Sequence, residues 1–284
     1  TKNAAHSITV GGVESNEFVF TADSKPANAF NAIVEAVNGN IHMPVTAATT
    51  ESGVVLKAKH SGESGNSLTV KINGVSSGLE MTVQPMDGGT KDPDVVFAPT
   101  QWETIVINCL GNKGHDGLME AGELKWAELD AQPFFAVSGS TSNATTLKTY
   151  SASRTEDRIN CVIPCPDSPT AHWIIAGNAA GLIASQANRD PALEFRGLTL
   201  NSVIAGDDLS QFDYATRDSL WKSGVSSVLK KAGSLKLENT VTFYHPEDTP
   251  DPEFGKVSYL VRLQNIIYNL SIIFNDPSWQ QAPL

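Results

Sequence analysis

Three short apolar runs separated by two helical patterns most constrain how this chain can fold. The runs cover residues 104–110, 134–138 and 159–163, and each has about the length of one buried strand. Apolar residues at helical spacing cover 117–130 and 144–153, between the runs. This alternation is typical of a parallel sheet whose strands are joined by covering helices. The middle of the chain is therefore predicted to be of α/β type.

The first 90 residues have a different pattern, in which short strands and turns dominate. Segments 7–10 and 17–21 flank Gly11-Gly12 as a hairpin, and a helix is predicted to begin at Lys25-Pro26 and to end at Asn38-Gly39. Four further strands are predicted at 45–49, 54–58, 68–72 and 79–84. Turn formers concentrate at 85–93, which predicts a boundary there.

The predicted fold class is α/β (α+β overall), a layered sheet with covering helices plus a smaller β-rich subdomain. The predicted domains are residues 1–90, β-rich with one helix, and residues 91–284, an α/β core that ends in a long helix. Two domains are expected because 284 residues exceed the usual size of a single core.

The last third of the chain predicts three helices and a hairpin. A long helix follows Pro169, and an amphipathic helix carries Phe212, Ala215, Leu220 and Trp221, with Trp221 expected to anchor it on the sheet. Strands flank the turn Ala232-Gly233. A final helix at 256–274 is expected to bury Leu260, Leu263, Ile266, Ile267, Leu270 and Phe274.

Composition excludes two classes of partner. The formal net charge is −11, and phosphate binding needs clustered Lys and Arg, so no nucleic acid is expected. The longest nearly apolar run, 266–274, is far short of the roughly 20 residues that span a bilayer, so no membrane insertion is expected. Three cysteines without framework spacing predict reduced, buried thiols in a cytoplasmic setting.

Two glycine-bearing segments look like motifs for chemistry. Residues 74–78 (GVSSG) satisfy G-x-S-x-G, but a nucleophile elbow needs a strand before it and a helix after it, whereas strands are predicted on both sides here. A hairpin turn at Asn73-Gly74 is the expected structure. Residues 111–117 (GNKGHDG) follow a strand, where a sheet could hold a phosphate, but they lack a nucleotide fingerprint. A plain loop whose Asp116 caps the next helix is expected.

No metal or cofactor site is predicted. Cys161, Cys165 and Cys109 lack the spacing of a zinc site, even with His172. The acidic loop has oxygen ligands for Ca²⁺, but its prolines break an EF-hand pattern, so a solvated connector is expected; its ionisable residues are His245, Glu247, Asp248, Asp251 and Glu253. Asp207 and Asp208 are expected to place favourable charge near a helix N-terminus rather than to form a dyad.

One combination of residues leaves an enzymatic alternative open. His172, Ser138, Ser140 and Asp167 stand at predicted strand ends and could form a hydrolytic triad in three dimensions. The alternative function is therefore an α/β-fold enzyme such as a hydrolase. No motif satisfies its own structural context, so we expect a protein that is not an enzyme, with no catalytic, cofactor-binding or metal residues.

Two separated strings of residues resemble contractile bacteriophage tail sheath proteins, the Mu-like branch above all. In that family a helix ending in a small-residue step leads to a hairpin and a Thr-Thr-Tyr-like strand end. The matching residues are Leu220, Ser223, Gly224, Val225, Ser226, Gly233, Leu237, Glu238, Thr240, Val241, Thr242 and Tyr244, with Phe243 where the family often has threonine. The earlier string matches at Met43, Pro44, Val45, Thr46, Ala47, Val55, Leu56, Lys57, Ala58, Lys59, His60, Gly62, Gly65 and Asn66.

This resemblance implies a structural protein of the virion, assembled in the bacterial host cytoplasm. The implied partners are other sheath subunits in hexameric stacked rings, the tail tube protein, and baseplate and terminator proteins, and no cofactor is implied. The implied action is contraction that drives the tube into the host cell, by rigid subunits moving on strand-donating arms. A third alternative, a receptor-binding module of the tail surface, would need an exposed aromatic or polar groove.

The resemblance also leads to an expectation about the isolated chain. The family's members extend beyond both ends of this sequence, which starts at Thr1, so we expect a fragment without the arms. Alone it should be a monomer or a weak oligomer that builds no tubes, with one open sheet edge.

Overall fold

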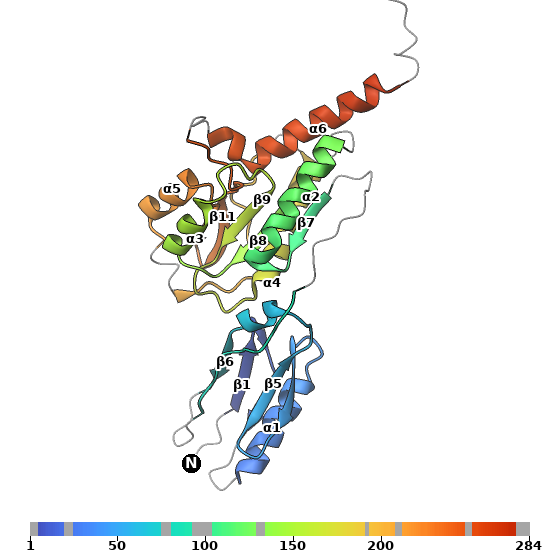
Figure 1. Cartoon of the computed structure of the whole chain (residues 1–284). Helices are drawn as coiled ribbons and strands as arrows, with labels where there is room; N and C mark the ends of the chain where they lie inside the picture. The colour runs from blue at the N-terminus through green and yellow to red at the C-terminus, as the bar shows by residue number, and fades with distance from the viewer. Residues whose placement is uncertain are drawn as a thin grey trace, which may run out of the picture. The chain divides into compact units, whose positions relative to one another are not determined.

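The computed structural model describes residues 5–19, 25–74, 81–92, 104–128, 134–190, 193–207, 212–247 and 252–276 (Figure 1). The chain divides into two compact units. One comprises Thr1–Pro93 together with Pro169–Ala171, and the other comprises Asp94–Ser168 together with His172–Leu284. The mixture of several sheets with α-helices confirms the predicted α/β fold class.

The first unit is organised around strand β1 (Ala5–Val10). It pairs antiparallel with β2 (Val13–Glu14), β3 (Phe18–Val19) and β6 (Val70–Asn73). Gly11 and Gly12 form the tight β1–β2 turn with φ values of 57° and 86°, a conformation that favours glycine. The turn predicted at Gly11-Gly12 is confirmed, but the strand that follows it is β2; β3, in the predicted strand 17–21, pairs with the other end of β1, and residues 20 and 21 lie outside the described part.

Helix α1 (Pro26–Asn38) packs on a hairpin of β4 (Val45–Thr49) and β5 (Val54–Ala58). Proline suits the first helical position because an N–H there has no helical partner. At the other end the Asn38 amide donates to the Ala47 carbonyl and accepts from its N–H, at 2.9 Å each. Both ends of this helix and both strands are where the sequence predicts them.

Residues 81–92 form no regular strand, so the strand predicted at 79–84 is wrong over its described part. Side chains hold this segment instead. The Asp92 carboxylate accepts from the N–H groups of Glu63 and Ser64, at 2.7 and 3.3 Å, and the Asn66 amide bonds both backbone groups of Gly89. These bonds satisfy backbone groups that a strand ladder would otherwise pair.

The second unit contains a parallel sheet in the order β7 (Thr104–Asn108), β8 (Phe134–Ser140) and β9 (Asn160–Pro164). Helix α2 (His115–Glu128) joins β7 to β8, and α3 (Ala144–Ser151) joins β8 to β9. The alternation of apolar runs and helical patterns predicted this arrangement. Within the described residues no strand pairs with the outer side of β7, so β7 is an open edge.

Helix α4 (His172–Arg189) packs closely on β7 and β8. Close approach depends on Gly139, because a Cβ there would lie 2.2 Å from the His172 carbonyl oxygen and 2.7 Å from the Ile175 Cβ. Ile175, Ala179 and Ile183 are fully buried. The small buried residues Ala176, Ala179 and Ala180 therefore let the helix backbone approach the sheet.

Helix α5 (Tyr214–Lys222) and the hairpin of β10 (Ser227–Lys231) and β11 (Ser234–Asn239) follow the prediction, including the turn at Ala232-Gly233. Two details are corrected. The helix begins after Phe212 and is capped by Asp213, whose carboxylate accepts from the Thr216 N–H at 2.7 Å.

The predicted helix anchor is also corrected. Leu220 is fully buried, whereas Trp221 is only half-buried, so Leu220 anchors α5 on the core. Asp207 lines one cleft with Asp213, the N-cap residue, and so lies near the helix N-terminus as predicted, while Asp208 lies outside the described residues.

Helix α6 (Val257–Phe274) exists as predicted, but its burial does not follow the prediction. Leu260 is buried, Leu263 and Ile267 are half-buried, and Ile266, Leu270 and Phe274 are exposed, at 50%, 44% and 63%. The prediction assumed that an apolar helix packs along its whole length. Figure 1 shows instead that the C-terminal end of α6, drawn in red, lies away from the sheet of its unit.

Candidate functional site

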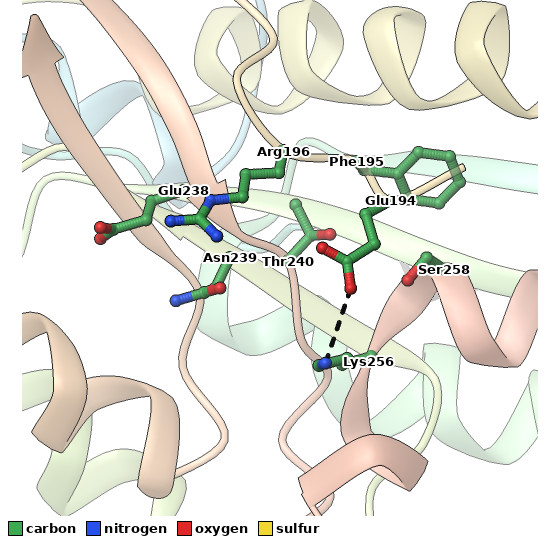
Figure 2. Close-up of a pocket in the computed structure, with 8 residues that line it drawn as sticks. All are labelled: Glu194, Phe195, Arg196, Glu238, Asn239, Thr240, Lys256 and Ser258. Carbon is green, nitrogen blue, oxygen red and sulfur yellow. Dashed lines mark ion pairs between the residues drawn. The ribbon is translucent and has the colours of Figure 1, made fainter.

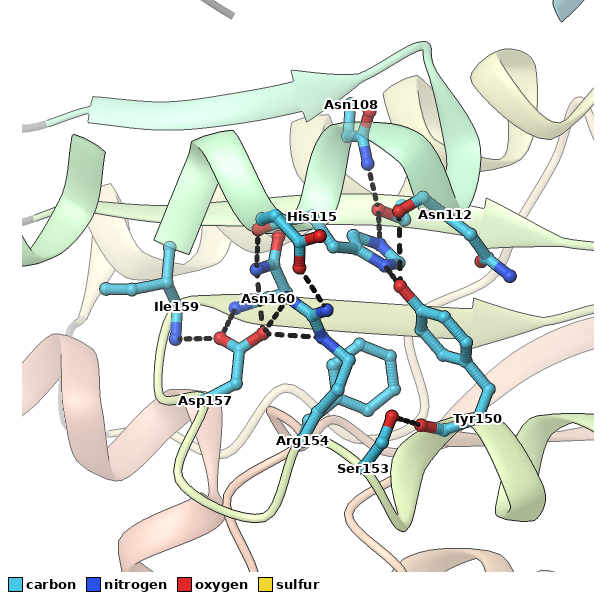
Figure 3. Close-up of polar contacts among 12 residues, drawn as sticks. Asn108, Asn112, His115, Tyr150, Ser153, Arg154, Asp157, Ile159 and Asn160 are labelled. Atoms are coloured by element: carbon cyan, nitrogen blue, oxygen red, sulfur yellow. Dashed lines mark hydrogen bonds and ion pairs between the residues drawn. The ribbon is translucent and has the colours of Figure 1, made fainter. Parts of the chain in front are cut away.

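A chain of buried polar side chains lies at the carboxyl ends of β7 and β8 (Figure 3). The Asn108 amide donates to the Ser138 hydroxyl at 2.8 Å, and the Ser138 oxygen lies 2.8 Å from Nε2 of His115. On the other side of the ring, Nδ1 of His115 lies 2.9 Å from the Tyr150 hydroxyl, which donates to the Asn112 carbonyl. The chain therefore joins β7, β8, α2 and α3.

The hydrogen bonds select the tautomer of His115. The orientation of the Asn108 amide is set by the Leu110 N–H, which donates to its oxygen at 2.9 Å. The Ser138 hydroxyl accepts from Asn108 and still has its own proton to donate to Nε2 of His115. Tyr150 uses its own proton on Asn112, so Nδ1 of His115 donates to Tyr150. A neutral His115 therefore carries its proton on Nδ1 and accepts from the Ser138 hydroxyl at Nε2.

Electrostatics support the neutral form. The pKa of His115 is lowered from 6.5 to about 3, chiefly by burial and also by the positive charge of Arg154, while Asp116 opposes the shift. Burial likewise raises the pKa of Tyr150. An imidazole with so low a pKa is a weak base at neutral pH.

The serine–histidine pair lacks access to a substrate. His115 is 0% exposed and Ser138 is 1% exposed. In a hydrolytic triad a carboxylate accepts from the second ring nitrogen and stabilises the imidazolium that forms, but here that position is held by the uncharged Tyr150 hydroxyl. The arrangement can fix the ends of two strands against two helices, and it cannot carry out acyl transfer in this conformation.

The structure does not bring the four predicted triad residues together. Nε2 of His172 lies 2.9 Å from the Cys109 carbonyl oxygen, and the Ser140 hydroxyl accepts from the Ser142 N–H. Asp167 lies in a tight turn with φ of 54°. Ser138 is the one residue of the four that meets a histidine, and the histidine is His115.

His115 was within a segment that the sequence singled out, residues 111–117, but with a different role. The segment forms a short 3-10 turn (Gly111–Gly114) that leads directly into α2. Gly114 is needed there because a Cβ would lie 2.5 Å from the Asn108 side-chain oxygen. The tertiary register of β7 against β8 decides that His115, rather than His172, reaches Ser138.

Charged residues beside this network are also structural. Asp116 does not cap α2 as predicted; it lies in the first turn, where its carboxylate binds Arg154. Arg154 also pairs with Asp157, which accepts from the N–H groups of Ile159 and Asn160 at 3.0 Å each (Figure 3). These contacts hold the start of β9.

The prediction of buried thiols is confirmed for two of the three cysteines. Cys161 and Cys165 are buried, and burial raises the pKa of each thiol to about 12. Cys109 is exposed, so the prediction is wrong for it, because β7 is the edge strand. All three are free thiols.

Among the described residues, no three His, Cys, Asp or Glu side chains cluster so as to hold a metal ion. Two predicted motifs fall partly outside that part of the chain. Residues 75–80 of the G-x-S-x-G segment are not described, nor are residues 248–251 of the acidic loop. No helix in the described ranges has the length and apolarity to cross a membrane.

A second candidate is a small cleft of about 20 Å³ between the β11 end and the start of α6 (Figure 2). It is lined by Glu194, Phe195, Arg196, Glu238, Asn239, Thr240, Lys256 and Ser258. Glu194 lies 3.7 Å from Lys256, and Glu238 binds Arg217 at 2.6 Å. The one aromatic residue, Phe195, is 2% exposed. This balanced set of charges offers neither a paired nucleophile and base nor an aromatic platform.

The similarity of this chain to known proteins is at the level of structure. No family model matches it, and no curated protein matches it. Among solved structures it is similar to the crystal structure of a sheath tail protein from Desulfitobacterium hafniense, with 12% sequence identity and a TM-score of 0.45. That match covers 97% of this chain and 65% of the other, so the chain spans about two thirds of the length of the matched structure. A likeness of this degree assigns no function.

Proposed function

We propose that this chain is a structural subunit of a contractile bacteriophage tail sheath of the Mu-like branch. Its partners would be other sheath subunits in stacked hexameric rings, the tail tube protein, and baseplate and terminator proteins. It would be assembled in the bacterial host cytoplasm and act in the virion, without cofactor or catalysis, by contracting to drive the tube into the host cell.

The observation that carries the proposal is the way in which the sheath-like string from Leu220 to Tyr244 folds. Gly224, in the small-residue step, has φ of 66°, and a Cβ there would lie 2.6 Å from the Phe243 carbonyl oxygen. Thr242, in the strand end, forms a bridge with Cys161 of β9, and the Phe243 N–H donates to the Asn160 carbonyl. Gly224 and Phe243, about 20 positions apart in one string, therefore pack directly on one another where the string contacts β9.

In the earlier sheath-like string, from Met43 to Asn66, residues of the string also pack closely on one another. Gly65 lies where a Cβ would be 3.3 Å from the Ala58 Cβ, and both residues belong to the string. Val45 and Ala47 are buried, whereas the alternate residue Thr46 is exposed. Such rigid joints suit a subunit that moves as a body during contraction.

Immunogold electron microscopy tests the proposal. Antibodies raised against the purified chain would be applied to phage particles released from cells that carry the gene, with antibody preabsorbed on the chain as the control. We expect label at regular intervals along the outside of a contractile tail. Label on the capsid or the baseplate alone, or on no particle, would contradict the proposal.

The Ser138–His115 hydrogen bond is the one observation that favours the alternative, an α/β-fold hydrolase. A serine-reactive fluorophosphonate probe followed by intact-mass measurement separates the two functions. We expect no adduct on the folded chain, because Ser138 is buried, while a known serine hydrolase in the same tube is labelled. An adduct that disappears in Ser138→Ala would favour the hydrolase.

A further inference from the structure

Helix α6 carries an apolar seam on its outward side. Leu263, Ile266, Leu270 and Ile273 recur at intervals of three, four and three residues, which are the a and d spacings of a coiled coil. At 3.6 residues per turn Ile266, Leu270 and Ile273 face away from the side that Val257, Leu260 and Gln264 bury against the core, and the half-buried Leu263 lies at the margin between the two sides. The helix is therefore apolar on two sides, and one of them has no cover within the described residues.

The exposure of the seam is substantial. Ile266 is 50% exposed, and Leu270 and Ile273 are each 44% exposed. Phe274, beside the seam, is 63% exposed. Single exposed apolar residues are normal on a protein surface, but a row of them at heptad spacing fits the matching row of another helix.

The distribution of charge indicates that the partner helix is α6 of a second copy of this chain. The chain has a net charge of −11, so most of its surface repels a second copy. Between Val257 and Phe274 the only charged residue is Arg262, and there is no acidic residue. Two copies can therefore meet at α6 without bringing like acidic charges together.

We propose that two copies of this chain pair through this seam as antiparallel helices. In that register Ile266 packs on Leu270 of the partner subunit, and Leu263 packs on Ile273 of the partner subunit. The twofold repeats both contacts, so four layers of leucine against isoleucine form. An antiparallel pair also holds the two acidic bodies at opposite ends, whereas a parallel pair would bring them side by side.

The pairing goes beyond the proposed function and does not rest on it, because it concerns the free chain in solution. A twofold contact closes on itself, so it yields a dimer and no tube. This agrees with the expectation of a weak oligomer from the sequence.

Sedimentation velocity on the full chain tests the interface. Between about 1 and about 100 μM we expect the wild type to shift from monomer to dimer. Ile266→Glu and Leu270→Glu should each raise the dissociation constant at least about tenfold. Ile41→Glu is the matched control, because Ile41 is an 81% exposed isoleucine of the other unit, and it should dimerise like the wild type.

A wild type that stays monomeric over the whole range would overturn the proposal, as would Glu variants that dimerise normally. Circular dichroism of each variant confirms that it is folded. Immunogold labelling does not depend on this interface, so a failure here is distinguishable from a failure of the proposed function.

Cysteine cross-linking tests the antiparallel register. The background is Cys109→Ser, which removes the exposed thiol, while Cys161 and Cys165 stay buried. We expect a mixture of Ile266→Cys and Leu270→Cys chains to form a disulfide-linked heterodimer under mild oxidation. Self-linked Leu270→Cys dimers in greater yield than the heterodimer would indicate parallel helices and overturn the register.

Discussion

Helices α4 and α6 have the same length, 18 residues, and opposite relations to the core. Helix α4 is built on small residues, with Ala176 and Ala179 buried, and it packs closely on the sheet beside Gly139. Helix α6 has larger apolar side chains, yet five residues from Ile266 to Phe274 are exposed by 44% or more. Burial thus follows the presence of a matching surface rather than the apolarity of the helix.

The same substitution on the two helices gives the largest expected contrast. Ile183 of α4 is 0% exposed, and Ile273 of α6 is 44% exposed. Ile183→Ala should lower the free energy of unfolding by about 3 to 5 kcal/mol, because it leaves a cavity in the core. Ile273→Ala, the matched control, should cost less than about 1 kcal/mol in the monomer.

Urea unfolding at low protein concentration measures both variants. Equal losses for the two isoleucines would mean that α6 packs on its own chain as closely as α4 does. The comparison between the helices would then fail.

The next largest contrast is in pH dependence: acidic pH should lower the stability of the core through His115 and should have little effect on pairing through α6. Unfolded histidine binds a proton below about pH 6.5, whereas folded His115 does so only near its lowered pKa of about 3. Between these values the unfolded state binds more protons, so stability falls as the pH falls, by up to about 1.4 kcal/mol per pH unit.

His115→Gln should remove this part of the pH dependence, measured by urea midpoints from pH 7 to 4. If His115 were accessible to protons in the folded chain, the urea midpoints of the wild type and of His115→Gln would fall equally steeply with falling pH. Helix α6 contains no Asp, Glu or His, so dimerisation through it should change little over the same range in the folded protein.

The smallest expected effect is in thiol reactivity, where one of the three cysteines should differ from the other two. With a thiol-reactive dye we expect Cys109 to react in the native protein, because it is exposed directly after the edge strand β7. Cys161 and Cys165 should react only after unfolding, since they are buried near α4 and their raised pKa disfavours the thiolate. Three fast thiols in the native state would contradict the burial of β9, and Cys109→Ser identifies the fast one.

Much of the fold was predictable because its signals are local. Pro26 and Asn38 mark the ends of α1, the turn at Ala232-Gly233 requires positive φ, and apolar runs of strand length alternate with helical patterns. The prediction failed at residues 81–84, where an alternating pattern lies in a segment held by Asp92 and Asn66 rather than by a neighbouring strand.

The candidate site was less predictable. Ser138 and His115 were each singled out in the sequence, but they were not paired with one another, because strand register and the close packing at Gly114 set the distance between them. The absence of a complete motif favoured a structural role, and the burial of the pair supplies a physical reason that no spacing could provide.

The sequence by itself determined which segments become strands and helices, because propensity, capping and turn chemistry act between residues close along the chain. Only the tertiary structure decided which apolar faces are covered. Ile183 and Ile273 are the same residue type at helical spacing, and they differ because one faces the sheet and the other faces solvent. Burial depends on what long-range packing places opposite a side chain, and local sequence carries no record of it.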